Sequence, residues 1–119
     1  MLTNGDMTVY HLAEGRSGES QEAGEYWVKT IIRGVCWLSG AAIQAESGIG
    51  TSGFRDAGWG EVYIPHSSWS GARPPCRCED RIARGIRQEL TPPQDALAVT
   101  SVINMDMGRT VRHWEIAAV

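Results

Sequence analysis

The run EYWVKTIIRGVCWL, Glu25 to Leu38, constrains the fold more than any other part of the sequence. It is rich in β-branched and aromatic residues and alternates with a period of two, which predicts a strand. Gly34 interrupts the run, and a glycine inside a strand indicates a bulge or a sharp bend. Because the segment is long for one strand, it predicts a strongly bent strand or a barrel corner. The two predicted faces carry Tyr26, Val28, Thr30 and Ile32 on one side and Trp27, Lys29, Ile31 and Arg33 on the other.

Shorter segments of the chain show the same extended pattern, and no segment keeps a helical period of 3.6 residues. Six or seven short strands, separated by loops that carry glycine and proline, predict an all-β fold. We expect a small β-barrel or sandwich with long loops, in a single domain over residues 1–119. The last two strands predict a hairpin. The shorter predicted strands are Met7 to Leu12, Ala41 to Glu46, Glu61 to Ile64, Arg81 to Gln88, Leu97 to Ile103 and Val111 to Ala117.

Two predicted loops are long for a domain of this size: the polar stretch Ala13 to Gly24 and the glycine-rich stretch Ser47 to Gly60. Long loops in compact domains are usually functional. Trp59 lies in the second loop, where an aromatic side chain either anchors a partner or folds back onto the barrel. Turns are also predicted at His66 to Pro75 and at Thr91 to Asp95.

The charge of the chain argues against nucleic-acid binding by charge neutralisation. The net charge is −3, and the basic residues do not gather in one patch. DNA could still pass such a protein without sticking to it. The first residues lack the pattern of a signal peptide, and no apolar run is long enough to span a membrane. We therefore expect synthesis in a cytosol, without disulfides and without membrane contact.

The stretch PPCRCEDRIARGI raises the question of a metal or redox site, because Cys76 and Cys78 lie close together. Structural zinc sites usually have four ligands and a wider cysteine spacing, and redox pairs usually have the spacing C-x-x-C. Cys36 and three scattered histidines are the remaining soft ligands. We expect two loop cysteines before a strand, and keep a zinc enzyme that uses Cys76, Cys78 and His66 as an alternative.

Other candidate chemistry has a simpler explanation. His113 and Glu115 are two positions apart in a predicted strand, so they share a face and form a surface ion pair at least as readily as a catalytic pair. The serines near His66 lack a G-x-S-x-G motif, and the glycine-rich stretch lacks the residues of a phosphate-binding loop. None of these patterns forms a catalytic site, and we expect a protein that is not an enzyme and needs no cofactor.

Three stretches together resemble a known family: MLTNGDMTVYHL, YWVKTIIRGVCWLS and RTVRHWEIAAV, the last preceded by LAVTSVINMD. They are similar to small structural proteins of siphophages that infect Gram-positive hosts, in particular head-closure (stopper) proteins of the phage neck. Glu79 and Asp80 correspond to a Gly-Asp turn of that family, followed by the strand Ile82 to Ile86. Glu79 therefore stands where the family has glycine.

The resemblance implies a β-barrel subunit in a homo-oligomeric ring, a dodecamer or hexamer, in the neck of the virion. The ring would lie between the portal or adaptor protein and the tail terminator or tail tube protein. It would close the channel, dock the tail and let genomic DNA pass without sequence-specific binding. The implied partner or lumen contacts are Phe54, Arg55, Asp56, Trp59 and Trp69, and the implied subunit contacts are Arg109, His113 and Glu115.

Two other functions remain open at this point. One is a monomeric β-barrel that binds a protein or ligand, for example a phage-encoded inhibitor of a host protein. The other is a tail terminator. Oligomeric state in the presence of portal or tail proteins would separate a ring component from a monomeric binding protein.

Overall fold

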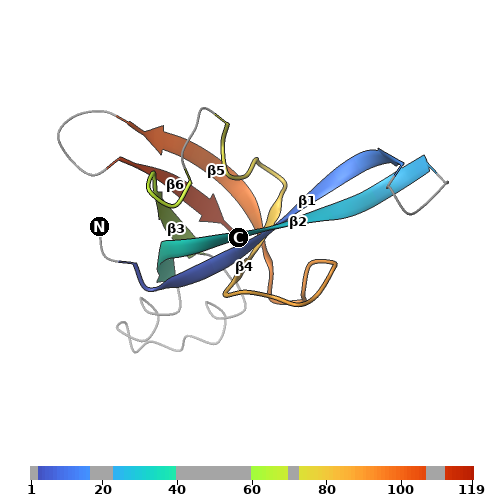
Figure 1. Cartoon of the computed structure of the whole chain (residues 1–119), viewed down its shortest axis with the longest axis horizontal. Coiled ribbons are helices and arrows are strands. Elements are labelled where there is room, and N and C mark those ends of the chain that lie inside the picture. The colour runs from blue at the N-terminus through green and yellow to red at the C-terminus, as the bar shows by residue number, and fades with distance from the viewer. Residues whose placement is uncertain (1–2, 17–22, 40–59, 70–72, 107–111) are drawn as a thin grey trace.

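The computed structural model describes residues 3–16, 23–39, 60–69, 73–106 and 112–119. Each hydrogen-bonded neighbour is antiparallel, and the strand order β1-β2-β3-β6-β5-β4 closes on itself (Figure 1). The predicted all-β fold is confirmed, and it is a closed barrel. Its six strands are β1 (Gly5–Arg16), β2 (Ala23–Ser39), β3 (Gly60–Pro65), β4 (Arg81–Arg84), β5 (Leu97–Met105) and β6 (His113–Ala118).

The barrel interior is filled by the apolar side of each alternating strand. In β6 the inward residues are Trp114, Ile116 and Ala118, and the residues between them are half-buried on the outer side. Closure removes the free edges that an open sheet would leave. The other strands contribute Met7, Val9, Ile32, Val35, Trp37, Val62, Ile64, Ile82 and Val99 to the same core.

Gly34 makes the predicted bend in β2. Its φ is +77°, and the register with β1 shifts there, so Gly34 is the extra residue of a β-bulge. The bulge is held on both sides: its N–H donates to Asp6 Oδ1 at 3.0 Å, and Ser68 Oγ donates to its carbonyl at 2.7 Å. Before the bulge β2 pairs with β1, and from Cys36 onward it pairs with β3. The predicted barrel corner is therefore confirmed.

The predicted loop Ala13 to Gly24 is wrong at both ends, because β1 continues to Arg16 and β2 begins at Ala23. The ladder runs without a break from Met7–Ile32 to Arg16–Ala23. Beyond Tyr10, β1 loses its second partner β4, and residues 23–35 of β2 pair only with β1 in the described residues. Residues 11–16 and 23–28 therefore leave the barrel as a two-stranded ribbon, called the arm here, which projects far beyond the other strands (Figure 1).

The strand predicted at Arg81 to Gln88 ends earlier, at Arg84, because Gly85 has a φ of +85° and turns the chain. The chain then crosses the outer side of β1. Thr8 Oγ1 donates to the Gly85 carbonyl at 2.8 Å and accepts the Arg87 N–H at 3.0 Å, and the Tyr10 hydroxyl donates to the Glu89 carbonyl at 2.8 Å. Thr8 and Tyr10 are consequently buried although they point out of the barrel.

Some of the other predicted segments are confirmed, and the rest lie outside the described residues. The hairpin of β5 and β6 is confirmed, as is the turn near Asp95. The strand predicted at Ala41 to Glu46 and the stretch from Ser47 to Trp59 lie outside the described residues. Within the described part of the chain, no helix is long and apolar enough to cross a membrane.

Candidate functional site

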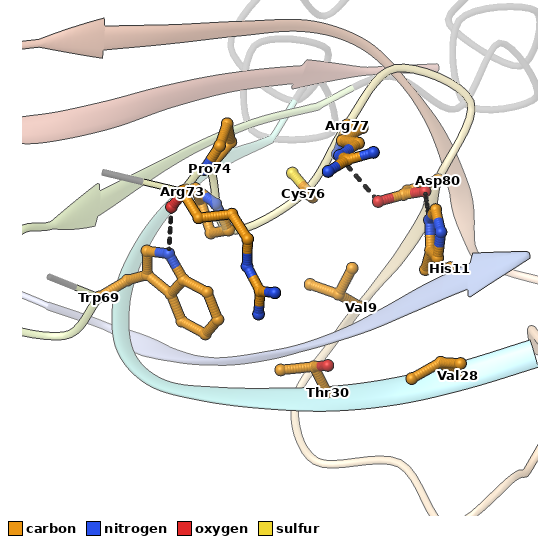
Figure 2. A pocket seen from close by; sticks show the side chains of 11 residues that line it. Val9, His11, Val28, Thr30, Trp69, Arg73, Pro74, Cys76, Arg77 and Asp80 are labelled. Carbon is orange, nitrogen blue, oxygen red and sulfur yellow. Dashed lines mark hydrogen bonds and ion pairs between the residues drawn. The ribbon is translucent and has the colours of Figure 1, made fainter. Parts of the chain in front are cut away.

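A pocket of about 240 Å³ lies where the arm leaves the barrel (Figure 2). Its floor comes from one face of the β1–β2 ladder, because Val9 is opposite Thr30 and His11 is opposite Val28. This face is the continuation of the core side of the barrel, where Val9 is buried. Val28 is 42% exposed, so the apolar stripe of the core reaches the surface in this pocket.

The opposite wall is the loop between β3 and β4, which includes the two cysteines. Residues 77–80 form a turn in which the Asp80 N–H donates to the Arg77 carbonyl at 3.0 Å. The Glu79 N–H donates to the Val99 carbonyl, and the Val99 N–H donates to the Asp80 carbonyl. The turn predicted at Glu79 and Asp80 is confirmed, and two hydrogen bonds attach it to β5.

Asp80 joins this wall to the arm. Its carboxylate is buried, and Oδ1 accepts a hydrogen bond from His11 Nδ1 at 2.7 Å. The other oxygen, Oδ2, accepts the backbone N–H of Arg77 at 2.8 Å. Both oxygens are therefore occupied, as a buried carboxylate requires. The carboxylate of Asp80 therefore serves to hold the loop and the arm together and is not available to a ligand.

Two guanidinium groups border the pocket and supply its positive charge. Arg73 and Arg77 are exposed, and neither guanidinium has a hydrogen bond or an ion pair with any of the described residues. Trp69 stands beside them: its indole Nε1 donates to the Arg73 carbonyl at 2.9 Å, and its ring packs on the core. Figure 2 shows the Arg73 side chain extending alongside the Trp69 ring. The pocket thus suits an anionic group that also carries apolar surface.

The cysteines offer no reactive group at this site. Cys76 is buried in the pocket wall, and burial, followed by the charge of Asp80, raises the pKa of its thiol to about 12. A thiol with such a pKa is protonated at neutral pH and is a poor nucleophile. Cys78 is exposed, with its sulfur 3.4 Å from the Thr100 carbonyl. Both precede β4, so their predicted place in a loop before a strand is confirmed.

Among the described residues, no group of three or more His, Cys, Asp or Glu side chains could hold a metal ion. Cys76, Cys78 and His66 accordingly do not form the zinc site kept as an alternative. His66 instead lies over Trp114, with ring centroids 5.7 Å apart, and its Nε2 is 2.8 Å from Asn104 Oδ1.

Two of the predicted contact residues, His113 and Glu115, lie apart from the pocket. His113 and Glu115 share the outer face of β6, and Nε2 of the histidine is 2.9 Å from Oε2 of the glutamate. The predicted pairing of these two side chains on one face of the strand is therefore confirmed. Of the predicted contact residues that the structure describes, Trp69 alone lines the pocket. Outside the described residues lie Phe54, Arg55, Asp56, Trp59 and Arg109.

Four polar pocket residues were not predicted from the sequence as part of a site: His11, Arg73, Arg77 and Asp80. His11 and Asp80 are 69 positions apart and meet only because β4 pairs with β1 to close the barrel. The one local signal was the turn at Glu79 and Asp80. A carboxylate that follows a turn often bonds backbone N–H groups nearby, and Asp80 does so with Arg77.

The fold and the site define a small closed β-barrel with a projecting two-stranded arm and a cationic pocket at the base of that arm. Over residues 2–119 the chain matches DUF6751, described as a family of unknown function, and it belongs to that family. No curated protein and no solved structure shows a significant match to the chain.

Proposed function

We propose that this protein is a structural component of a tailed-phage neck. In this role it forms a ring between the portal or adaptor protein and the tail, closes the DNA channel and docks the tail. The motifs at both ends of the chain and around Gly34 support the proposal through their resemblance to head-closure proteins. The ring symmetry implied by that resemblance is a dodecamer or hexamer, and the place of action is the virion neck after synthesis in the host cytoplasm.

The observation that carries the proposal is the arm. Two-stranded ribbons are marginally stable by themselves, and a ribbon with free edges and apolar side chains gains stability from a partner. Two apolar side chains of the arm, Leu12 and Val28, are 39% and 42% exposed. A ring supplies such a partner at every subunit, because each copy has a neighbour on both sides.

The charge of the chain suits a protein that surrounds DNA without holding it. With a net charge of −3, the ring as a whole repels phosphates, so genomic DNA slides through rather than binds. We assign subunit contacts to Arg109, His113 and Glu115, of which His113 and Glu115 are exposed in part on the outer face of β6.

A second candidate function is a monomeric β-barrel that binds a protein, for example an inhibitor of a host protein. The pocket beside Trp69 favours it, because aromatic and arginine side chains are enriched at protein interfaces. A third candidate function is that of a tail terminator, in which the same ring would lie at the end of the tail. The ring and the monomer differ in mass when portal complexes or heads are present.

The deciding experiment measures mass by light scattering, first for the protein alone and then with assembled portal complexes, full heads or tails. We expect a ring-sized mass added to heads. A matched variant replaces residues 13–26 by Asn-Gly, which joins the opposed residues Leu12 and Trp27 by a two-residue hairpin turn and removes most of the arm. Circular dichroism checks that its barrel folds. Wild-type protein that binds neither heads nor tails would overturn the neck role and leave the monomeric function.

A further inference from the structure

The far part of the arm carries two carboxylates that face each other. Glu14 and Glu25 are register partners across β1 and β2, and both are exposed. Like charges directly opposite each other in an antiparallel pair are destabilising. No ion pair with a described side chain compensates either one. A cationic partner would remove this repulsion.

The pocket at the base of the arm carries the complementary charge. Arg73 and Arg77 are exposed, and their guanidinium groups have no partner among the described residues. Arginine binds carboxylates through paired N–H donors, so two guanidiniums match two glutamates. With about 240 Å³, the pocket is smaller than the roughly 300–1,000 Å³ typical of small-molecule sites, and it suits protein side chains.

The arm of the same chain does not reach this pocket. His11, which lines the pocket, and Glu14 are three residues apart on β1, so their side chains point to opposite faces of the ribbon. Three residues of strand also place Glu14 about 10 Å further out along the arm. Figure 1 shows the arm directed away from the barrel. The carboxylates can therefore meet a pocket only on another molecule.

We propose that the pocket binds the arm of a second copy of this chain, with Glu14 and Glu25 of one copy paired to Arg73 and Arg77 of the next. Leu12 lies on the same face of the arm as the two glutamates, because its register partner Trp27 is two residues from Glu25. Leu12 thus adds apolar contact beside the charges, against the apolar surface around Trp69.

This contact joins two different surfaces: the arm of one copy and the pocket at the base of the arm of the next copy. Such a heterologous contact leaves one arm and one pocket free in every dimer, so it continues until a ring closes. The inference rests on the proposed function for the symmetry and the place of the ring, and it adds a subunit contact to the one assigned to Arg109, His113 and Glu115. The contact between copies can be measured without any virion component.

The first test reverses the charges on each side. We expect wild-type protein to associate in sedimentation velocity, and the Arg73→Glu/Arg77→Glu and Glu14→Arg/Glu25→Arg variants to associate on the order of tenfold more weakly. The protein that combines all four changes should regain association, because the charges are complementary again. The single variants Arg73→Glu and Arg77→Glu should each weaken association too. Their control is Arg33→Glu, the same change of two charge units at an exposed residue outside the pocket, which should associate like wild type.

Three results would overturn the contact. The first is wild-type protein that stays monomeric up to the order of 1 mM at low salt. The second is an equal effect of Arg33→Glu, which would indicate net charge alone. The third is a four-fold variant that fails to associate although circular dichroism shows it folded. Far-UV spectra of all variants separate misfolding from a lost contact.

A second test locates the contact directly. Arg73→Lys introduces an amine that a carbodiimide couples to a carboxylate only when the two are in contact. We mix ¹⁴N-labelled and ¹⁵N-labelled protein and identify the linked peptides by mass spectrometry. The expected product is a mixed-isotope link between position 73 and Glu14 or Glu25. Links confined to one isotope, links to other carboxylates, or no link would contradict the proposal.

The two proposals fail in different ways. Protein that adds a ring to heads, while the charge variants bind equally well, would retain the neck role and exclude this contact. Protein that associates through the arm and pocket but ignores heads, portals and tails would retain the contact and exclude the neck role.

Discussion

Asp80 and His11 are 69 positions apart in the chain and 2.7 Å apart in space, where the buried carboxylate of one accepts a hydrogen bond from the imidazole of the other. This bond connects the loop before β4 to the arm. The same carboxylate also accepts the backbone N–H of Arg77, so Asp80 fixes the turn at residues 77–80 that forms one wall of the pocket.

The first prediction concerns the unequal roles of these two partners. Asp80→Ala should lower the free energy of unfolding by about 1–3 kcal/mol, because it leaves the Arg77 N–H without its partner. His11→Ala should cost less than about 1 kcal/mol, since the imidazole is half exposed and can be replaced by water. Urea unfolding followed by tryptophan fluorescence measures both. Equal losses would mean that Asp80 acts through His11 alone.

The second prediction concerns Glu79, the only non-glycine residue with a positive φ among the described residues, at +78°. It occupies the third position of the turn from Arg77 to Asp80, where glycine is favoured. Left-handed backbone costs a residue with a Cβ about 1–2 kcal/mol, and glycine loses about 0.5–1 kcal/mol through entropy. Glu79→Gly should therefore raise the free energy of unfolding by up to about 1 kcal/mol.

The matched controls for Glu79 test the cause. Gln88→Gly, at an exposed position without a positive φ, should destabilise by about 0.5–1 kcal/mol. Glu79→Val should destabilise by more than about 1 kcal/mol, because a β-branched residue tolerates this backbone poorly. If all three substitutions shifted the urea midpoint in one direction, backbone strain at Glu79 would not be the reason.

The third prediction concerns the bulge that turns β2 from β1 to β3. A Cβ at Gly34 would lie 3.1 Å from Ser68 Oγ, at a φ of +77°. Gly34→Ala should thus lose about 1–2 kcal/mol of unfolding free energy. Gly24→Ala in the arm is the control: its Cβ would meet nothing within 4 Å, and stability should stay within about 0.5 kcal/mol. A tolerated alanine at position 34 would show that β2 can bend without the bulge.

The fourth prediction is a loss of stability at alkaline pH that depends on Cys76. Burial raises the pKa of this thiol from 9.0 to about 12, so above pH 9 the unfolded chain releases a proton that the folded chain keeps. Stability is therefore complete below pH 9 and falls by at most about 1.4 kcal/mol per pH unit from pH 9 toward pH 12. Burial also raises the pKa of Tyr10 from 10.0, which adds a loss in the same direction at higher pH.

Urea unfolding of wild type and Cys76→Ala between pH 8 and pH 10 isolates this contribution. The variant starts less stable because of its smaller side chain, but its stability should fall less steeply with pH. Alkylation gives an independent readout: in the folded protein Cys78 should react first, and Cys76 only after unfolding. Parallel pH profiles together with rapid labelling of Cys76 would contradict the burial of this thiol.

Local pattern was sufficient for much of the fold. The two-residue alternation in β2, β3 and β6 reports which side chains face the core, because a strand in a barrel has one buried and one outer side. Gly34 could be predicted as a bend because glycine inside a strand has few other uses. The cysteines could be placed in a loop because the extended pattern resumes only after them. His113 and Glu115 could be paired because a spacing of two puts them on one face.

Local pattern failed where a partner strand rather than composition decided the structure. Residues 13–16 and 23–24 are alanine, glycine or charged and resemble a loop, yet each has a register partner that continues the ladder of β1 and β2. Tyr10 lies on the outer side of the barrel and is fully buried, because the chain after Gly85 crosses over it.

Sequence alternation alone determined that this protein is a small all-β domain, a barrel or a sandwich, since a period of two is a property of neighbouring residues. The tertiary structure alone decided where its pocket lies. His11 comes from β1, and Trp69, Arg73 and Asp80 come from the segment between β3 and β4; they meet because β4 closes against β1 while the bulge at Gly34 redirects β2. Closure and register depend on hydrogen bonds between distant strands, and the order of residues within one segment does not specify them.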